Sequence, residues 1–362
     1  MISLWPFAPI AMLLRMVVRN GGVSLLRIPM LVAYLLRFLL FEPFRIAERL
    51  LFDKTIQSTP LQESPIFILG HWRSGTSHLQ TLMSLDSRYT SSTIYRSFFS
   101  DSFYLTESWL KPILNQFSRI VGLRFSIQRS HLDLDIQAEG DLGLCCFTSP
   151  YSYTWGHLFP RTFGQWMQKM VLSPKPSMTE NWLSVYDFFL RKLSYGAGGK
   201  RVVMKSPGDT GRLCSLAEYY PGAKFIYIHR TATEVFHSNR YLWNVILKEN
   251  GMQSLSDSQI DETIIENYRS LLLRYAEQRE QIPSEQLIEI QYSALRDDPI
   301  TVLQKVYAHL QLGQLEEDRI RSFLETQPSY STQKYQTSDE VTQMISREWS
   351  EVEKRFDDIS LS

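Results

Sequence analysis

The chain has 362 residues, of which 44% are hydrophobic and 21% are charged. This composition supports a large core and excludes a disordered chain, a collagen and a disulfide-rich miniprotein. Lysine plus arginine and aspartate plus glutamate both total 38, so the formal net charge is zero. A protein that binds nucleic acid through bulk charge carries a basic excess, so we do not expect a nucleic-acid partner.

The charge balance and the cysteines give two further indications. Residues 1–56 carry a net charge of +4, which the rest of the chain cancels. Three cysteines, Cys145, Cys146 and Cys214, form neither a disulfide framework nor the CxxC pairs of a zinc site. We therefore expect a reducing, cytoplasmic location.

An apolar, basic, helical leader over residues 1–59 is the first predicted element, and it precedes a domain at residues 60–362. Its longest uninterrupted apolar run, Ile28–Leu36, is far shorter than the about 20 residues that span a bilayer. The chain start lacks the basic residues of a secretory signal. Apolar residues recur at helical spacing at Ile28, Leu31, Val32, Leu35, Leu36, Leu39 and Leu40.

Two interpretations of this leader stay open. In the first, residues 1–56 lie on the cytoplasmic face of a membrane as a peripheral contact, with Arg27 and Arg37 reaching the headgroups. In the second, the leader packs against its own domain or against a second subunit in a homo-oligomer.

Strand-like and helix-like patterns follow one another after the leader. Short apolar runs predict strands at Ile66–Leu69, Arg201–Lys205, Lys224–His229 and Leu287–Tyr292. Helical periodicity predicts helices over Ile260–Gln281 and Val302–Leu312. Strands that alternate with helices predict an α/β fold with a central parallel sheet covered on both faces.

A glycine-rich loop follows the first strand. The sequence GHWRSGTS at residues 70–77 has the glycine spacing of a phosphate-binding loop between a strand and a helix. Such a loop turns backbone N–H groups toward an anion at the positive end of the helix. Thr76 stands where a nucleotide triphosphatase has lysine, and the cation is Arg73 inside the loop. The alternative is a simple strand-to-helix turn.

A second candidate anion site follows the strand at 224–229. Arg230 is expected at the carboxyl edge of the sheet, and Ser238 on an early turn of the next helix. Both side chains can face one phosphate dianion. Taken alone, however, such residues are typical of surface and capping positions.

The two elements together, GHWRSGTS and HRTATEVFHS at 229–238, resemble the sulfotransferases that use 3′-phosphoadenosine 5′-phosphosulfate (PAPS). The first looks like the family's 5′-phosphosulfate loop and the second like its 3′-phosphate motif. VMKSP at 203–207, YYPGAKF at 219–225 and YSAL at 292–295 extend the resemblance, which matches the bacterial-type branch best. It implies a P-loop NTPase-like three-layer fold. It assigns the donor to Arg73, Ser74, Gly75, Thr76, Ser77, Arg230, Ser238 and Tyr292, with Ser77 where threonine is usual.

Charge explains why these residue types suit sulfuryl transfer. Negative charge grows on the oxygen that bridges the donor's sulfur and phosphorus, and Arg73, Lys205 and the loop N–H groups can neutralise it. The apolar strands end in Lys205 and Arg230 rather than in an acidic residue, so no metal is expected.

The segment 129–141 is the candidate source of the general base. It is rich in ionisable residues within an apolar stretch, and Glu139 falls where the resemblance places a catalytic glutamate. Burial beside an apolar acceptor raises a carboxylate's pKa toward a useful value. His131 is the second candidate base and His71 the third. The alternative is a solvated acidic turn with helix caps.

An aromatic run lies between this segment and the second strand. Its members are Tyr151, Tyr153, Trp155, Phe159, Phe163 and Trp166. They either line an acceptor site or belong to the ordinary core.

Taken together, the sequence predicts an enzyme that transfers a sulfuryl group from PAPS to a hydroxyl of a hydrophobic or lipid-like acceptor. An amine is the second choice of acceptor group. A nucleotide-dependent phosphotransferase and a non-catalytic, membrane-associated nucleotide-binding protein are the alternatives.

Overall fold

The chain forms two compact units. The computed structural model describes residues 8–122, 124–125, 130–131, 133–147, 150–326 and 339–356. Unit 1 comprises Met1–Gln62, Ser92–Gly199 and Tyr241–Ile260, and unit 2 comprises Glu63–Ser91, Lys200–Arg240 and Asp261–Ser362. The contacts therefore group the leader with later segments of the chain, while the predicted boundary at residues 59 and 60 stays a prediction.

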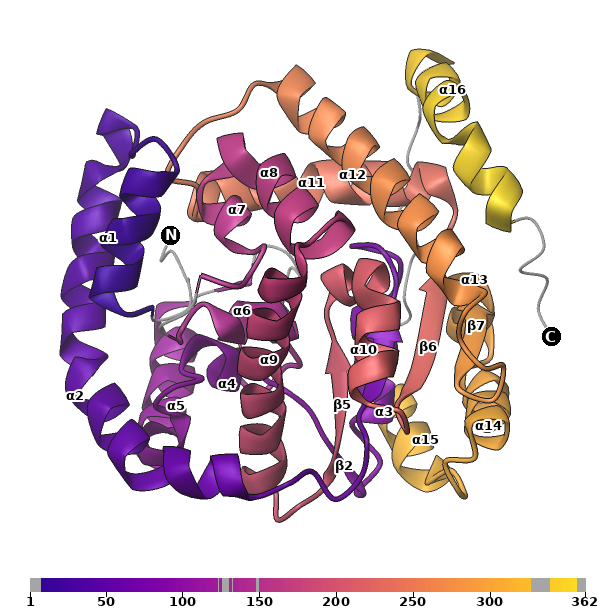
Figure 1. Ribbon diagram of the computed structural model, residues 1–362, viewed down its shortest axis with the longest axis horizontal. Helices are drawn as coiled ribbons and strands as arrows, with labels where there is room; N and C mark the ends of the chain where they lie inside the picture. The colour runs from indigo at the N-terminus through magenta and orange to yellow at the C-terminus, as the bar shows by residue number, and fades with distance from the viewer. Residues whose placement is uncertain are drawn as a thin grey trace. The chain divides into compact units, whose positions relative to one another are not determined.

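Unit 2 is built on a five-stranded parallel sheet of order β2-β5-β1-β6-β7 (Figure 1). The strands are β1 (Ile66–Leu69), β2 (Tyr89–Thr90), β5 (Arg201–Lys205), β6 (Lys224–His229) and β7 (Leu287–Gln291). All four predicted strands are present, and the last ends one residue early. The edge strand β2 is too short for a periodic pattern, so the sequence does not predict it.

Alternating side chains of β1 pack against helices on the two faces of this sheet. Ile66 and Ile68 join one core with residues of helices α3 (Thr76–Met83) and α14 (Pro299–Leu310). Phe67, on the opposite face, contacts Tyr220 at the end of α10 (Leu213–Tyr219). Both faces are therefore buried, which explains why β1 is a continuous apolar run rather than an alternating one.

The helices of unit 2 follow the strands in alternation. They are α3 (Thr76–Met83), the 3-10 helix η4 (Pro207–Arg212), α10 (Leu213–Tyr219), α13 (Tyr292–Asp297), α14 (Pro299–Leu310), α15 (Glu317–Thr326) and α16 (Asp339–Phe356). α11 (Ala232–Glu249) and α12 (Asp257–Arg279) belong in part to each unit. The predicted helices at 260–281 and 302–312 correspond to α12 and α14. The predicted α/β fold, with a central parallel sheet flanked by helices, is confirmed.

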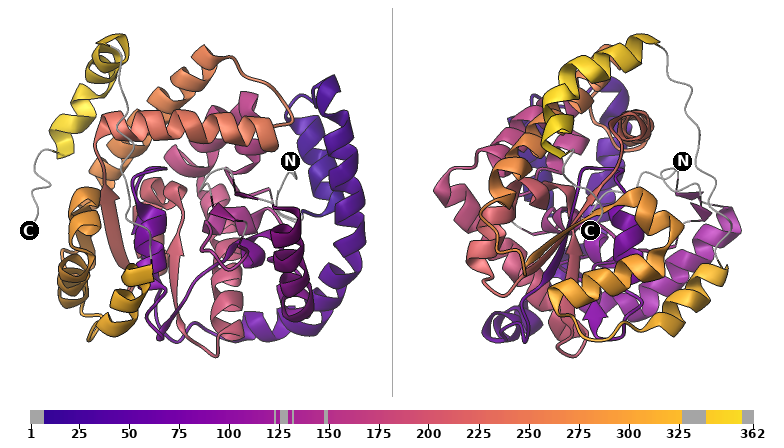
Figure 2. Two further views of the ribbon diagram at one scale, coloured as in Figure 1. Left: turned by 180° about the vertical axis from the view of Figure 1, so that it is seen from behind. Right: turned by 90° about the vertical axis from the view of Figure 1, so that its right-hand side faces the viewer.

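Unit 1 is mainly helical. Its helices are α1 (Ile10–Arg19), η1 (Leu25–Arg27), α2 (Ile28–Ser58), α4 (Ile94–Phe98), α5 (Phe103–Val121), α6 (Gly140–Leu144), α7 (Trp155–Leu158), η2 (Pro160–Thr162), α8 (Phe163–Met167), the π-helix η3 (Gln168–Leu172) and α9 (Pro176–Gly196). Two short strands, β3 (Arg124–Phe125) and β4 (Ser130–His131), pair antiparallel. Helix α1 lies beside α2, and α2 packs on α5 and α9 (Figures 1 and 2).

The leader is helical, as predicted, but its two flanking arginines contact protein. Arg27 donates hydrogen bonds to the carbonyls of Leu247 and Lys248 at 3.0 and 3.2 Å. The Arg37 guanidinium lies 4.8 Å from the Tyr34 ring centroid, and burial lowers the pKa of Arg37. Neither helix of the leader, nor any other helix in the described ranges, is long and apolar enough to cross a membrane.

Candidate functional site

The loop between β1 and α3 has three residues with positive φ angles. Gly70 has φ 145°, Arg73 has φ 69° and Gly75 has φ 104°. The Ser74 hydroxyl and backbone N–H both donate to the carbonyl of His71, at 2.8 and 3.2 Å. A non-glycine residue such as Arg73 adopts this conformation only where its surroundings impose it, and such positions cluster at functional sites.

Gly75 allows an aromatic ring to lie directly against the loop. A Cβ atom at Gly75 would lie 2.2 Å from Cδ2 of Tyr292, the first residue after β7. The Arg230 guanidinium stacks over the same ring, 4.7 Å from its centroid. The loop, the β6 end and the β7 end therefore meet at one point of the sheet edge.

The two predicted anion motifs are in direct contact. Arg73 Nε donates to Ser238 Oγ on α11 at 2.8 Å, and Arg230 Nη1 donates to the carbonyl of Arg73 at 3.2 Å. Arg73 is 165 residues from Ser238 and 157 from Arg230 in the chain, and the three meet because β1 and β6 are paired neighbours in the sheet. The structure thus brings together Arg73, Gly75, Arg230, Ser238 and Tyr292.

Arg230 has one buried N–H donor that no described residue accepts from. Its Nη2 donates to Glu234 at 3.2 Å, but its Nε is buried and has no partner among the described residues. Glu234 also accepts from the Thr231 hydroxyl at 2.6 Å, and these bonds with Arg230 and Thr231 lower the pKa of Glu234 against the opposing effect of burial. A buried donor without an acceptor is costly. An anion bound at this edge would satisfy it, so the residues present fit a phosphate group.

Lys205 is the last residue of β5 and pairs in register with Ile68 of β1. Because β5 runs parallel to β1, Lys205 lies at the same carboxyl edge as the loop, and it is buried, at 3% exposure. The 3-10 helix η4, which follows β5, holds the start of the loop, because Thr210 Oγ1 accepts a hydrogen bond from the Gly70 N–H at 2.8 Å. Sequence reasoning missed Thr210, since a hydroxyl in a 3-10 helix has no distinguishing pattern.

His71, the third candidate base, is enclosed. Its Nδ1 lies 3.0 Å from the carbonyl of Trp72, and Asn267 Nδ2 on α12 lies 3.4 Å from its Nε2. Asn239 on α11 donates to the same Trp72 carbonyl at 2.9 Å. Burial lowers the pKa of His71 to about 4, so the ring is neutral at pH 7. These contacts give His71 a role in holding the loop, and the sequence did not predict the two asparagines.

Glu139, the first candidate base, belongs to unit 1 and is half-buried at the residue before α6. The segment that leads to it is tied to α4 and to the residues just before α4 by backbone hydrogen bonds, including Tyr95 N–H to Leu134 and Ala138 N–H to Ser92. The Ser97 hydroxyl also donates to the Glu139 carbonyl at 3.3 Å. The residue is therefore on a fixed backbone, and its role as base stays a prediction.

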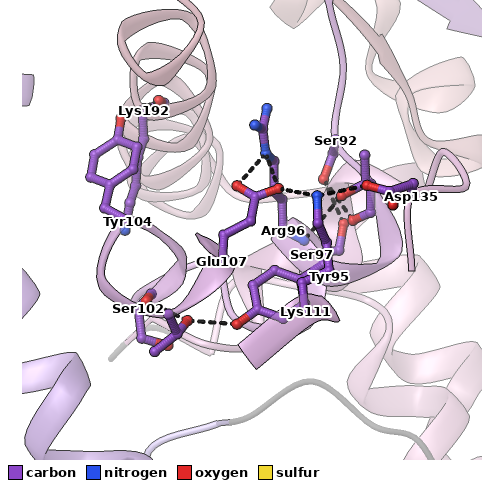
Figure 3. Close-up of polar contacts among 12 residues, drawn as sticks. Ser92, Tyr95, Arg96, Ser97, Ser102, Tyr104, Glu107, Lys111, Asp135 and Lys192 are labelled. Carbon is purple, nitrogen blue, oxygen red and sulfur yellow. Dashed lines mark hydrogen bonds and ion pairs between the residues drawn. The ribbon is translucent and has the colours of Figure 1, made fainter. Parts of the chain in front are cut away.

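Ion pairs hold the same segment to α5. Glu107 accepts from both Arg96 and Lys111 at 3.0 Å, and Lys111 also donates to Asp135 at 2.7 Å (Figure 3). Asp135 thus has a structural partner. The side chain of His131, the second candidate base, lies outside what the structure describes, and only its backbone in β4 is given.

The aromatic run is largely core. Tyr151 is half-buried, and the other five members are buried. Phe163 stacks on His157 with ring centroids 5.1 Å apart, and Trp243 meets that histidine edge-on at 5.4 Å. Burial lowers the pKa of His157 to about 4. These five rings are therefore buried, and whether any of them lines an acceptor site stays a prediction.

No group of three or more histidine, cysteine or acidic residues suited to a metal ion occurs in the parts of the chain that the structure describes. The donor set at the sheet edge is cationic and hydroxylic. Such a set suits an anionic ligand rather than a metal ion.

A parallel sheet with a glycine-containing loop after its first strand, and with Lys205 and Arg230 at the ends of the two strands beside it, has the arrangement of a P-loop-like α/β fold. A model of the sulfotransferase family matches residues 65–317. The chain belongs to the sulfotransferase family and is an enzyme of that class.

Similar proteins agree with this assignment. The chain is 28% identical over 312 residues to proteins named omega-hydroxy-beta-dihydromenaquinone-9 sulfotransferase Stf3 from Mycobacterium bovis and Mycobacterium tuberculosis, covering 85% of this chain and 79% of each relative. Two crystal structures share the fold. The sulfotransferase STF9 from Mycobacterium avium has a TM-score of 0.67 and 18% identity, over 86% of this chain and 81% of its own. The sulfotransferase STF1 from Mycobacterium tuberculosis has a TM-score of 0.63 and 17% identity, over 94% of this chain and 90% of its own.

Proposed function

We propose that this sulfotransferase moves a sulfuryl group from PAPS to a hydroxyl of a hydrophobic, lipid-like acceptor. The observation that carries the donor assignment is the contact of Arg73 with Ser238 and Arg230, which joins the two predicted anion motifs. Two separate phosphate-binding elements at one sheet edge suit a donor with phosphates at both its 5′ and 3′ positions.

Each residue at the edge has a role in this proposal. Arg230 and Ser238 bind the 3′-phosphate, and residues 73–77 bind the 5′-phosphosulfate. Arg73 and Lys205 neutralise the charge that grows on the bridging oxygen when the sulfur leaves it. Gly75 lets the ring of Tyr292 lie against the loop, where it orients the Arg230 guanidinium.

Glu139 is the proposed base that removes the acceptor's proton. It is a half-buried carboxylate on a backbone held by hydrogen bonds, and a carboxylate can serve as a proton acceptor. His131 is the alternative base.

The acceptor class rests on a relative. The Stf3 proteins are named for a hydroxylated menaquinone, a lipid-like molecule with a hydroxyl. A related acceptor for this chain would lie in a membrane, so we extend the proposal to a peripheral contact of residues 1–56 with the cytoplasmic face of a membrane.

A transfer assay tests the proposed function. The full-length protein is incubated with PAPS labelled in its sulfuryl group and with a total lipid extract, and the organic phase is analysed for labelled product. We expect one labelled class of lipid, which an Arg73→Ala variant fails to produce. Label that stays in the aqueous phase with every lipid fraction, although the donor binds, would exclude a lipid acceptor.

A further inference from the structure

The outward face of α2 is apolar over most of its length. Its exposed apolar residues between Ile28 and Leu51 are Ile28, Pro29, Val32, Ala33, Leu36, Leu39, Leu40, Pro43, Ile46, Leu50 and Leu51. They recur at steps of three and four, so they form one stripe of about 35 Å along the helix. Arg49 is the one exposed charged residue in this span, all of which the structure describes.

The charged residues of α2 point the other way. Glu48 is fully buried and forms an ion pair with Lys192 on α9, and it accepts a hydrogen bond from the Leu105 N–H at 3.0 Å. Arg45 lies 3.5 Å from Asp101, whose pKa burial raises to about 8. This part of the helix is therefore inverted relative to a surface helix in water, because Arg45 and Glu48 face protein and the aliphatic stripe faces outward.

Helix α5 carries a second outward stripe. Trp109, Ile113, Phe117 and Ile120 are 44%, 56%, 47% and 76% exposed and lie three or four residues apart. The charged pair of this helix, Glu107 and Lys111, lies on its opposite side in the ion pairs with Arg96 and Asp135 (Figure 3). Glu48 of α2 and the pair Glu107 and Lys111 of α5 thus form ion pairs inside unit 1, while the outward stripes of both helices are hydrocarbon.

The two stripes adjoin. Helix α2 packs on α5, and the rings of Phe44 and Trp109 are in contact with centroids 5.8 Å apart. Figure 1 shows α5 beside α2 within unit 1. At the start of α2, Leu25 and Leu26 are 83% and 94% exposed. Together these residues make a continuous apolar surface, larger than the scattered apolar residues that soluble monomers expose.

The exposed charged residues of the helices in this region have one sign. In the described parts of α1, α2 and α5, every exposed charged residue is basic: Arg15, Arg19, Arg49, Lys54 and Arg119. Apolar side chains surrounded by basic ones fit the interface of an anionic bilayer. A two-fold contact between copies would place like charges opposite one another, which is unfavourable.

We infer that the α2 and α5 stripes form one lipid-facing surface, on which the protein lies in the interface of an anionic membrane with Leu25 and Leu26 inserted. This inference rests on the proposed membrane contact of the leader and adds to it α5, which is 45 residues beyond the end of α2 in the chain.

Vesicle co-sedimentation of the full-length protein tests the inference. The vesicles contain phosphatidylcholine with about 30% phosphatidylglycerol, and pure phosphatidylcholine serves as the uncharged comparison. Phe117→Glu should lower the apparent partition coefficient about 10-fold or more, because it places a charge at a buried lipid contact. Ser108→Glu is the matched control, since it adds the same charge at an exposed position of α5 outside the stripe and should bind nearly as well as the unchanged protein.

A third variant and a salt control make the outcome decisive. Leu26→Glu should lower binding as Phe117→Glu does, and about 0.5 M salt should weaken binding of the unchanged protein through its basic residues. If Leu26→Glu lowers binding and Phe117→Glu does not, α5 is outside the surface and the inference fails. If the protein binds no vesicles, and sedimentation shows a dimer that Phe117→Glu converts to monomers, the surface is an interface between copies and the inference fails.

Donor binding keeps this test separate from the proposed function. The affinity for 3′-phosphoadenosine 5′-phosphate, measured without vesicles, should be the same in all these variants. Loss of vesicle binding with intact donor affinity bears on the surface alone. A protein that binds vesicles and donor but transfers no sulfuryl group overturns the proposed function and leaves the surface standing.

Discussion

Replacing Arg230 by alanine should weaken donor-nucleotide binding in a way that depends on the 3′-phosphate. The buried Arg230 Nε has no partner in the described structure and is free to meet an anion. A hydrogen bond to a charged group contributes about 1.5–3 kcal/mol, so its loss corresponds to an affinity about 10- to 150-fold lower for 3′-phosphoadenosine 5′-phosphate.

A second ligand separates this contact from the other role of Arg230. The side chain also donates to the Arg73 carbonyl, so its removal loosens the loop and lowers the affinity for any nucleotide. Adenosine 5′-phosphate shares only that second effect. Calorimetry with both ligands should therefore show a much larger loss for the 3′-phosphorylated one.

The control variant is Arg321→Ala, which removes an exposed arginine of α15 paired with Glu317. It should bind both nucleotides as the unchanged protein does. An equal loss of affinity for both nucleotides in Arg230→Ala would refute the 3′-phosphate assignment and leave a loop-holding role. Unchanged affinity for both would remove Arg230 from the site.

Three further predictions concern the base, the buried ion pair and acid stability. Glu139→Gln should lower turnover about 10²- to 10⁴-fold with donor affinity intact, and loss of turnover in His131→Ala instead would identify the imidazole as the base. Lys192→Met should lower the free energy of unfolding, measured in urea, by about 3–5 kcal/mol because it isolates the buried Glu48 carboxylate. Adding Glu48→Gln should restore much of the lost stability. A loss below about 1 kcal/mol in Lys192→Met would contradict the burial of the pair. The free energy of unfolding should fall as the pH drops from about 6.5 to about 4, since a histidine whose folded pKa is lowered to about 4 takes up its proton first in the unfolded chain. His157→Phe should make this decline shallower, and an unchanged slope would show that His157 does not contribute.

Local patterns determined the strands and the loop. The apolar runs of β5 and β6 are bounded by basic residues and that of β1 by Pro65 and Gly70, and both faces of a parallel sheet are buried, so each run marks its own strand. The residues at the strand ends, among them Lys205 and Arg230, follow directly from where those runs stop. The paired motifs then indicated the family, which the match over residues 65–317 confirms.

The tertiary structure decided which residues meet. Thr210 holds Gly70, and Asn267 reaches His71 from a helix 196 residues further along the chain. Many hydroxyls and amides in the sequence have the same chemistry, and nothing local distinguishes the ones that become partners. The strand order, which places β1 between β5 and β6, selects them.

The orientation of α2 is the clearest case of a feature that the local sequence pattern does not decide. Its periodicity predicted an amphipathic helix but left open which face is buried. The partner of Glu48 is Lys192, 144 residues away, and this buried ion pair turns the charged side of the helix inward. A period of 3.6 residues locates a stripe on a helix, whereas only the packing partners determine whether that stripe faces the core or the outside.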